Sequence, residues 1–210
     1  MKALDLISTS LNSPNDEPNQ KLAKEIIASK NYEWVKELAE NLSNEDKNIQ
    51  SDCIKVLYEI GERGAPELIA AHWKAFIDIL YSKNNRLVWG AMTAIDKIAL
   101  LKPSEIFKNL ELIEKIIEKG SVITIDHGIS ILAKLASFKE YQNQVIPKLI
   151  NQLEKCPAKQ FPMYIEKSVI AMNKSTKEDF IGIIEIRYKD LEKDSQKKRV
   201  EKIRKKILSL

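Results

Sequence analysis

The feature that most constrains this chain is a repeat of about 38 residues that carries the same helical pattern three times. The first helices of the repeats align without gaps over residues 46–57, 84–95 and 121–132. Each segment opens with Asp, Asn or Ser, whose side chains cap a helix by accepting orphan backbone N–H groups. Such a repeat predicts stacked helical units that bury their apolar faces against their neighbours.

Each of the three helices has one narrow apolar stripe. A small residue comes first, an aliphatic pair follows three and four positions later, and a further aliphatic residue completes the face. We expect the small residue to let a neighbouring helix approach closely. The stripe residues are Cys53, Val56, Leu57 and Ile60, then Ala91, Ala94, Ile95 and Ile98, then Gly128, Ile131, Leu132 and Leu135.

A second amphipathic run follows each first helix after a short break. Pro66 and Pro103 stand near the same offset in two of the breaks, and proline fits the first turn of a helix because its missing N–H costs nothing there. Pro147 falls inside the third run and is expected to kink that helix or delay its start. The second runs are predicted over residues 67–81, 106–118 and 141–153.

Helical patterns continue on both sides of these units. An earlier hairpin is expected from 19–29 with 32–41, and a later one from 161–172 with 177–191. Residues 11–20 are rich in Asn and Pro, which predicts a loop between a first short helix and the stack. Only six glycines and seven prolines occur in 210 residues, a composition that favours helices over the many turns of a β protein.

The residue order of the first helices resembles that of the HEAT and armadillo superfamily of α-solenoids. Both of the first two units depart from the family pattern at its arginine position, where they carry Gln50 and Val88. The resemblance implies an all-α fold, an α-solenoid of about five antiparallel helical hairpins in a right-handed superhelix. The matching residues are Asp46, Ile49, Cys53, Val56 and Leu57, and in the next unit Asn84, Leu87, Ala91, Ala94 and Ile95.

We therefore expect a single helical-repeat domain over residues 1–210. An N-terminal helix and loop would occupy 1–19, the repeats 20–191, and a basic C-terminal capping helix 192–210. A terminal helix with a polar outer face is what a repeat stack needs at its end.

The positive charge is concentrated in that last segment. The chain has 34 Lys/Arg and 30 Asp/Glu, and residues 1–189 hold 26 of each, so residues 190–210, with 8 basic and 4 acidic side chains, supply the whole excess of +4. One reading is a solvated capping helix whose cationic end suits the helix dipole. The other is an electrostatic patch for nucleic acid or an acidic partner. Seven of the eight basic side chains would form this patch: Lys197, Lys198, Arg199, Lys202, Arg204, Lys205 and Lys206.

The sequence offers little for catalysis. No two glycines have the spacing of a phosphate-binding loop, and Cys53, His72, His127 and Cys156 lie in separate segments, so we expect no metal site, no cofactor and no catalytic residue. Two distant cysteines indicate a reducing compartment rather than a disulfide framework. No apolar run has the length of a bilayer span, and we expect a cytoplasmic protein without a membrane partner.

The predicted function is a non-enzymatic scaffold or adaptor. In HEAT-type stacks the second helices line the concave face, so the resemblance implies that a protein partner binds there. His72, Trp73 and Tyr81 would form an aromatic spot on that face, and exposed aromatic residues are the usual anchors of protein interfaces. The alternative for the tryptophans is that Trp34, Trp73 and Trp89 seal the contacts between repeats.

A nucleic-acid-binding or DNA-repair protein is the alternative function. The chain is similar in length and in its helical repeats to bacterial alkylpurine DNA glycosylases of the HEAT-like type, in which tryptophans, an aspartate and basic residues grip DNA. Trp73 with Asp78, or Trp89 with Asp96, are the candidates here. A groove for a phosphate backbone should be basic, whereas the second helices are mixed in charge, which favours the scaffold. Their charged residues include Lys74, Asp78, Glu111, Glu114, Lys115, Glu118, Lys148, Glu185 and Arg187.

The repeat register makes a prediction about stability. Leu57 and Leu132 occupy the same stripe position, so truncating either to Ala should lower the free energy of unfolding by about 2–5 kcal/mol, the usual cost of a core cavity. Urea unfolding of each variant measures the loss. A change below about half a kcal/mol would show that the register is wrong, because surface substitutions usually fall in that range.

Overall fold

The computed structural model describes all 210 residues, as helices joined by short loops and without any strand. The predicted all-α class is confirmed. The chain divides into two compact units, Met1–His127 and Gly128–Leu210. The four short 3₁₀ helices are η1 (Ala3–Leu6), η2 (Asn41–Ser43), η3 (Ala70–His72) and η4 (Ser168–Ala171).

The α-helices follow one another in antiparallel pairs along the chain. Those of the first unit are α1 (Glu17–Ser29), α2 (Tyr32–Glu40), α3 (Lys47–Glu62), α4 (Pro66–Ile69), α5 (Trp73–Ile79), α6 (Asn85–Ile98), α7 (Pro103–Phe107) and α8 (Leu110–Lys119). The unit boundary falls inside α9 (Val122–Ala136), and the second unit continues with α10 (Lys139–Lys155), α11 (Phe161–Lys167), α12 (Lys177–Tyr188) and α13 (Asp194–Leu208).

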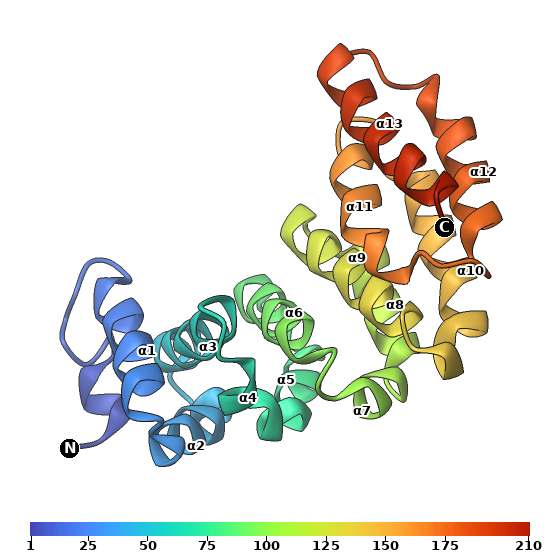
Figure 1. Cartoon of the computed structure of the whole chain (residues 1–210). Coiled ribbons are helices and arrows are strands. Elements are labelled where there is room, and N and C mark those ends of the chain that lie inside the picture. Colours follow the sequence, from blue (N-terminus) through green and yellow to red (C-terminus); the bar gives the residue numbers. More distant parts are fainter. The chain divides into compact units, whose positions relative to one another are not determined.

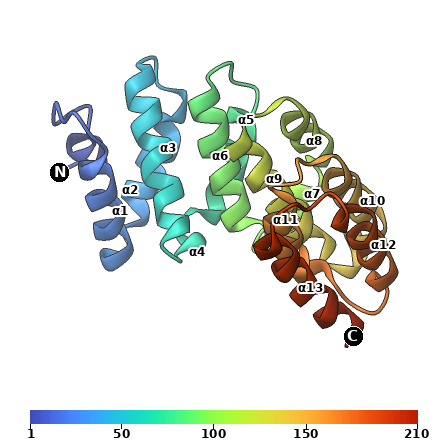
Figure 2. The same cartoon turned by 90° about the horizontal axis from the view of Figure 1, so that it is seen from above.

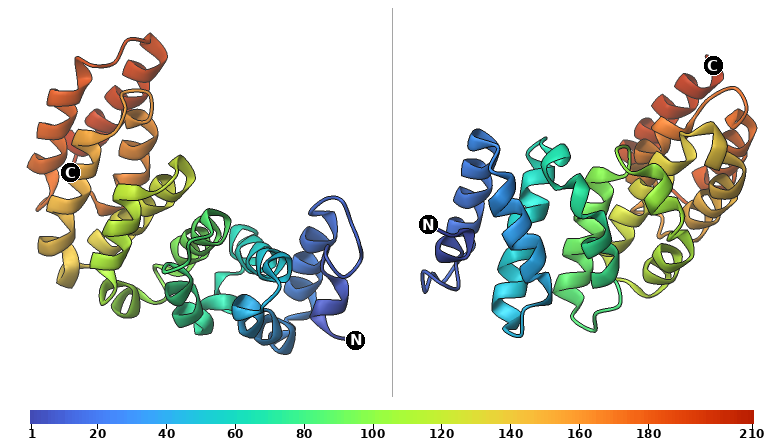
Figure 3. Two further views of the ribbon diagram at one scale, coloured as in Figure 1. Left: turned by 180° about the vertical axis from the view of Figure 1, so that it is seen from behind. Right: turned by 90° about the horizontal axis from the view of Figure 1, so that it is seen from below.

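The helices of the first unit form two rows. The long helices α1, α3 and α6 lie side by side, with α3 packed between the other two (Figure 1). The shorter helices α2, α4 and α5 form a second row beside these three long helices, where they contact α3 and α6 (Figures 2 and 3). We call these the first-helix row and the second-helix row.

The predicted capping residues begin the three repeat helices. The Asp46 carboxylate accepts a hydrogen bond from the Asn48 N–H at 2.8 Å, and the Asn84 side chain accepts one from the Arg86 N–H at 3.0 Å. The Ser121 hydroxyl accepts from the Thr124 N–H at 3.4 Å. Each cap satisfies one of the backbone donors that a helix start leaves open.

The repeated stripe is the core of the stack. All its residues are buried, and the aliphatic members have no exposed surface: Val56, Leu57, Ile60, Ala94, Ile95, Ile98, Ile131, Leu132 and Leu135. The register predicted from the 38-residue repeat is therefore confirmed.

Two glycines bring α3 and α6 together. A Cβ placed on Gly90 would lie 2.8 Å from Cγ1 of Ile54, and one on Gly61 would lie 2.8 Å from Cβ of Lys97. Both distances are shorter than any ordinary carbon–carbon contact. On α6, the close contact with α3 therefore lies at the residue immediately before Ala91, the small residue of the stripe.

The second helices differ in detail from the prediction. The run over 67–81 is divided into α4, η3 and α5, with Pro66 at the first helical position, and Pro103 opens α7 in the same way. The predicted delay at Pro147 is wrong, because α10 begins at Lys139 and continues through the proline to Lys155. The helix continues through Pro147 because the proline removes only one backbone hydrogen-bond donor, while the apolar side chains around it remain buried.

A loop joins the short helix η1 to the stack, as predicted, and the structure shows that this N-terminal segment is packed onto the stack. The loop ends at Asp16, because Pro18 fits the first turn of α1. The Ser8 N–H donates to Oδ1 of Asn19 at 2.9 Å, and the Asn19 amide donates to Asp52 at 2.7 Å. The N–H and hydroxyl of Thr9 both donate to the other oxygen of Asp52. This buried network fixes the loop against α1 and α3.

A buried arginine holds the second unit together at the end of α10. The Arg187 guanidinium donates to the carbonyls of Leu153 and Glu154 with Nη1 and to the Cys156 carbonyl with Nη2, and its Nε contacts Asp190 at 2.8 Å. A helix C-terminus leaves its last carbonyls without partners, and a cation there also suits the helix dipole. Arg187 is thus an internal cap and not one of the surface charges counted for the second helices.

The C-terminal helix α13 lies within the predicted segment 192–210 and buries one apolar face. Val200, Ile203 and Ile207 are buried, and α13 packs against α11 and α12. Arg199 on its flank forms a two-armed ion pair with Glu166 of α11, at 2.8 and 2.5 Å. The Arg199 guanidinium lowers the pKa of the Glu166 carboxyl.

The length and hydropathy of each helix decide whether it could cross a membrane. No helix combines the length and the apolar character that crossing a bilayer demands.

The close contact at Gly90 gives a test of the packing. Gly90→Ala should lower the free energy of unfolding by about 1–3 kcal/mol, because the added methyl group overpacks the α3–α6 contact. Gly182→Ala is the matched control, since a Cβ there meets nothing within 4 Å inside helix α12. It should raise stability by about 0.5–1 kcal/mol through helix propensity. Urea unfolding measures both, and equal effects of the two substitutions would contradict the tight contact.

Candidate functional site

An open groove of about 590 Å³ crosses the second-helix row, and two of the three predicted partner-binding residues line it. His72 comes from η3 and Tyr81 from the turn after α5. The opposite wall comes from the end of α2, from η2 and from the first turn of α3. We call this surface the α2–α5 groove.

The groove has an apolar floor and a polar rim. Leu42 and Leu87 are almost fully buried below it, while Tyr81 is 73% exposed at the edge. The carboxylates of Glu40 and Asp78 also line it. Such a surface has an aromatic anchor beside charged groups, as interface patches commonly do.

His72 contributes a neutral ring to the groove. Partial burial lowers the pKa of its imidazole, although the charge of Glu40 works in the opposite direction. Since the ordinary value already lies below 7, the ring is uncharged at neutral pH. It therefore has one hydrogen-bond donor and one acceptor to offer a ligand.

The acidic residues of the rim are only loosely neutralised. Glu40 lies 4.0 Å from Lys36, and Asp78 lies 2.6 Å from Lys74, in both cases one helical turn away and exposed. Surface pairs of this kind are weak, so both carboxylates remain free to exchange partners. Sequence reasoning missed Glu40 because it lies in the preceding hairpin.

The structure separates the tryptophans from this groove. Trp73 follows His72 but does not line the groove, because successive residues of a helix point in different directions. Trp34 donates from Nε1 to the Met1 carbonyl at 3.4 Å. Trp89 packs on the Tyr58 ring with centroids 5.6 Å apart. The last two contacts join neighbouring elements of the stack.

A series of contacts between charged and polar side chains runs along the first-helix row. The sequence did not predict these contacts. Nδ1 of His127 lies 2.9 Å from a carboxylate oxygen of Asp96, and Lys97 lies 3.8 Å from both Asp96 and Glu62. The Asp96 carboxylate therefore orients the imidazole ring of His127. Asp96 and His127 are 31 positions apart in the sequence. A search for polar residues about one repeat apart could have found this pair.

Neither thiol is suited to nucleophilic chemistry. Burial raises the pKa of Cys53 to about 12, with smaller contributions from the charges of Asp52 and Glu37. Burial also raises the pKa of Cys156, although Arg187 acts in the opposite direction. A thiol must ionise to attack or to bind a metal, so both cysteines behave as core residues. No group of three or more His, Cys, Asp or Glu residues is placed to hold a metal ion.

The predicted basic residues lie on α13, where a second open groove of about 490 Å³ is found. Two of the seven basic residues form ion pairs within the chain: Arg199 pairs with Glu166, and Arg204 lies 3.6 Å from Glu201. The groove is lined by four of the lysines, Lys197, Lys198, Lys202 and Lys205. We call this surface the α13 groove.

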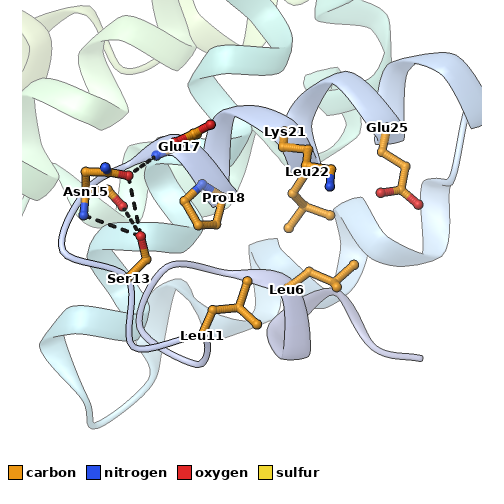
Figure 4. A pocket seen from close by; sticks show the side chains of 9 residues that line it. All are labelled: Leu6, Leu11, Ser13, Asn15, Glu17, Pro18, Lys21, Leu22 and Glu25. Carbon is orange, nitrogen blue, oxygen red and sulfur yellow. Dashed lines mark hydrogen bonds between the residues drawn. The ribbon is translucent and has the colours of Figure 1, made fainter.

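A third pocket, of about 350 Å³, lies between α1 and the N-terminal loop (Figure 4). Leu6 and Leu11 face Pro18 and Leu22 across it. The loop is tied to the helix start because the Asn15 side chain accepts from the Glu17 N–H at 3.0 Å. The pocket marks the place where a loop, and not another hairpin, covers the outer face of α1.

Comparison with solved structures identifies the fold. The chain superimposes over its full length on an engineered protein solved by the Northeast Structural Genomics Consortium, with 18% identity, complete coverage of both chains and a TM-score of 0.68. A designed armadillo repeat protein in complex with a (KR)4 peptide matches 100% of this chain with 99% of its own, at 16% identity and TM-score 0.63. Computationally designed armadillo repeat proteins for modular peptide recognition match 96% of each chain, at 15% identity and TM-score 0.64.

The chain thus has an armadillo-like repeat fold, as its first helices predicted. No protein-family model matches the sequence. No curated protein matches it either.

The state of the cysteines can be checked directly. In native protein at pH 8, neither Cys53 nor Cys156 should react with a thiol reagent such as Ellman's, because burial raises the pKa of both thiols and keeps the reagent away from both side chains. Both should react at once after unfolding in urea. Rapid stoichiometric labelling of the native protein would contradict the burial of these residues.

Proposed function

We propose that this protein is a non-enzymatic interaction scaffold that binds an extended segment of a protein partner in the α2–α5 groove. The observation that carries the proposal is the apolar-floored groove with His72 and the highly exposed Tyr81 at its edge. A tyrosine of this kind offers a large rigid contact area at a small entropic cost, which is why such residues dominate interfaces.

The fold supports the proposal without naming a partner. Repeat stacks present extended surfaces for binding, and one designed protein of the same fold was solved with a (KR)4 peptide. Function still resides in the particular side chains of a surface. Here the carboxylates of Glu40 and Asp78 favour a segment with a basic side chain beside an apolar one.

The same carboxylates argue against the alternative of a DNA-binding groove. A phosphate backbone obtains most of its affinity from neutralisation by Lys and Arg, and Glu40 and Asp78 would repel it. The residues named for a DNA-repair site also have other roles, since Trp89 packs on Tyr58 and Asp96 contacts His127. The groove therefore supports a protein segment better than it supports DNA.

Peptide display tests the proposal. Selection of a random 12-residue library on the wild-type protein should enrich peptides that combine basic and apolar residues. Tyr81→Ala should then weaken their binding about 30-fold, equivalent to a hot-spot effect of about 2 kcal/mol. Fluorescence polarisation with the enriched peptides measures the effect.

Tyr32→Ala is the matched control. Tyr32 is also an exposed tyrosine, at 56%, but it lies at the start of α2 outside the groove. Its substitution should leave peptide affinity unchanged. If no peptide is enriched, or if enriched peptides bind the Tyr81 variant as tightly as the wild type, the proposal fails.

A further inference from the structure

The solvent face of α13 has a concentration of positive charge that its own chain does not neutralise. The helix carries seven basic residues and two acidic ones, Asp194 and Glu201. Arg199 and Arg204 are held in ion pairs with Glu166 and Glu201. The lysines form no ion pair within the chain, so their charge is available to a ligand.

Four of these lysines converge on one groove. Lys198, Lys202 and Lys205 follow one another on successive helical turns, and Lys197 lies beside the first of them. Residues three and four apart are neighbours on the face of a helix, so the ammonium groups form a line along α13. Both carboxylates of the helix also line the groove, which retains a net charge of +2 from four lysines against two acidic residues.

An aromatic ring completes the surface. Tyr188, at the last position of α12, lines the same groove and is half-buried. A line of cationic side chains beside an aromatic ring is the arrangement by which proteins hold single strands, since the cations follow the phosphates and the ring stacks on an unpaired base.

The packing of α13 disfavours the other anionic partners. A membrane surface would require an apolar face to insert, but Val200, Ile203 and Ile207 are already buried against the unit's own helices. An acidic peptide would use the lysines but has no regular need of the tyrosine. A duplex would offer phosphates, but its bases are stacked inside.

We propose that the α13 groove is a binding site for single-stranded nucleic acid, held by Lys197, Lys198, Lys202 and Lys205 and by stacking on Tyr188. The site is independent of the proposed peptide groove, because it lies in the other compact unit. Either proposal can therefore fail while the other stands.

Fluorescence anisotropy of the full chain with a labelled 20-nucleotide oligo-dT strand tests the site. Binding should weaken as salt increases. Changing the four lysines together to Gln should lower affinity at least tenfold at about 50 mM salt. It should also reduce the slope of log affinity against log salt by about three, because each neutralised phosphate of a single strand contributes about 0.7 to that slope.

A matched quadruple variant separates the site from overall charge. Lys24→Gln, Lys83→Gln, Lys115→Gln and Lys119→Gln remove four exposed lysines of the first unit, and this variant should bind like the wild type. Tyr188→Leu should weaken oligo-dT binding while leaving the salt slope unchanged. Circular dichroism checks that each variant remains folded.

Three outcomes would overturn the proposal. The wild type could fail to bind oligo-dT at about 50 mM salt, where electrostatic binding is stronger than at physiological salt, or the two quadruple variants could bind equally weakly. It would also fail if poly-glutamate, a 20-base-pair duplex or vesicles with anionic lipid bound more tightly than the single strand.

Discussion

The structure depends on one constraint, that a single amphipathic hairpin cannot remove its apolar stripe from water by itself. The stripe of α3 is buried because helices of both rows lie against α3, among them α1, α2, α4 and α6. Burial of such side chains is the main source of stability in a stack. Close contact is achieved at Gly61 and Gly90, where the glycine has no side chain and the facing Lys97 and Ile54 side chains fill the space. Packing this tight leaves no room for variation at these positions, whereas the outward faces remain unconstrained.

Stacking short helices also creates many helix ends, and each end exposes backbone groups that need partners. Asp46, Asn84 and Ser121 satisfy donors within their own segments. Elsewhere the partner comes from a distant part of the chain. Arg187 caps α10 from more than thirty residues away, and Asp52 binds the N-terminal loop. Buried polar groups of this kind are costly without partners, which explains why both networks are nearly complete.

The two candidate binding surfaces follow from what this packing leaves exposed. Charged and aromatic residues that do not contribute to a stripe gather where short helices end, so the α2–α5 groove forms at the break between η3 and α5. The α13 groove lies on the face of α13 that does not pack against α11 and α12. The charged side chains of the α2–α5 groove are the carboxylates of Glu40 and Asp78, whereas in the α13 groove four lysines outnumber two carboxylates, so the two surfaces suit ligands of opposite charge.

The sequence by itself determined the helical class, the repeat register, the capping residues and the presence of a last basic helix, because each of these depends on spacings within about one repeat. Only the tertiary structure decided which side chains meet. It paired His127 with Asp96, placed Tyr81 and His72 in a groove without Trp73, and turned Arg187 inward. It also let α10 continue through Pro147. The physical reason is that periodicity specifies which face of a helix is buried, whereas contacts between hairpins depend on how their ends and breaks fit together in space.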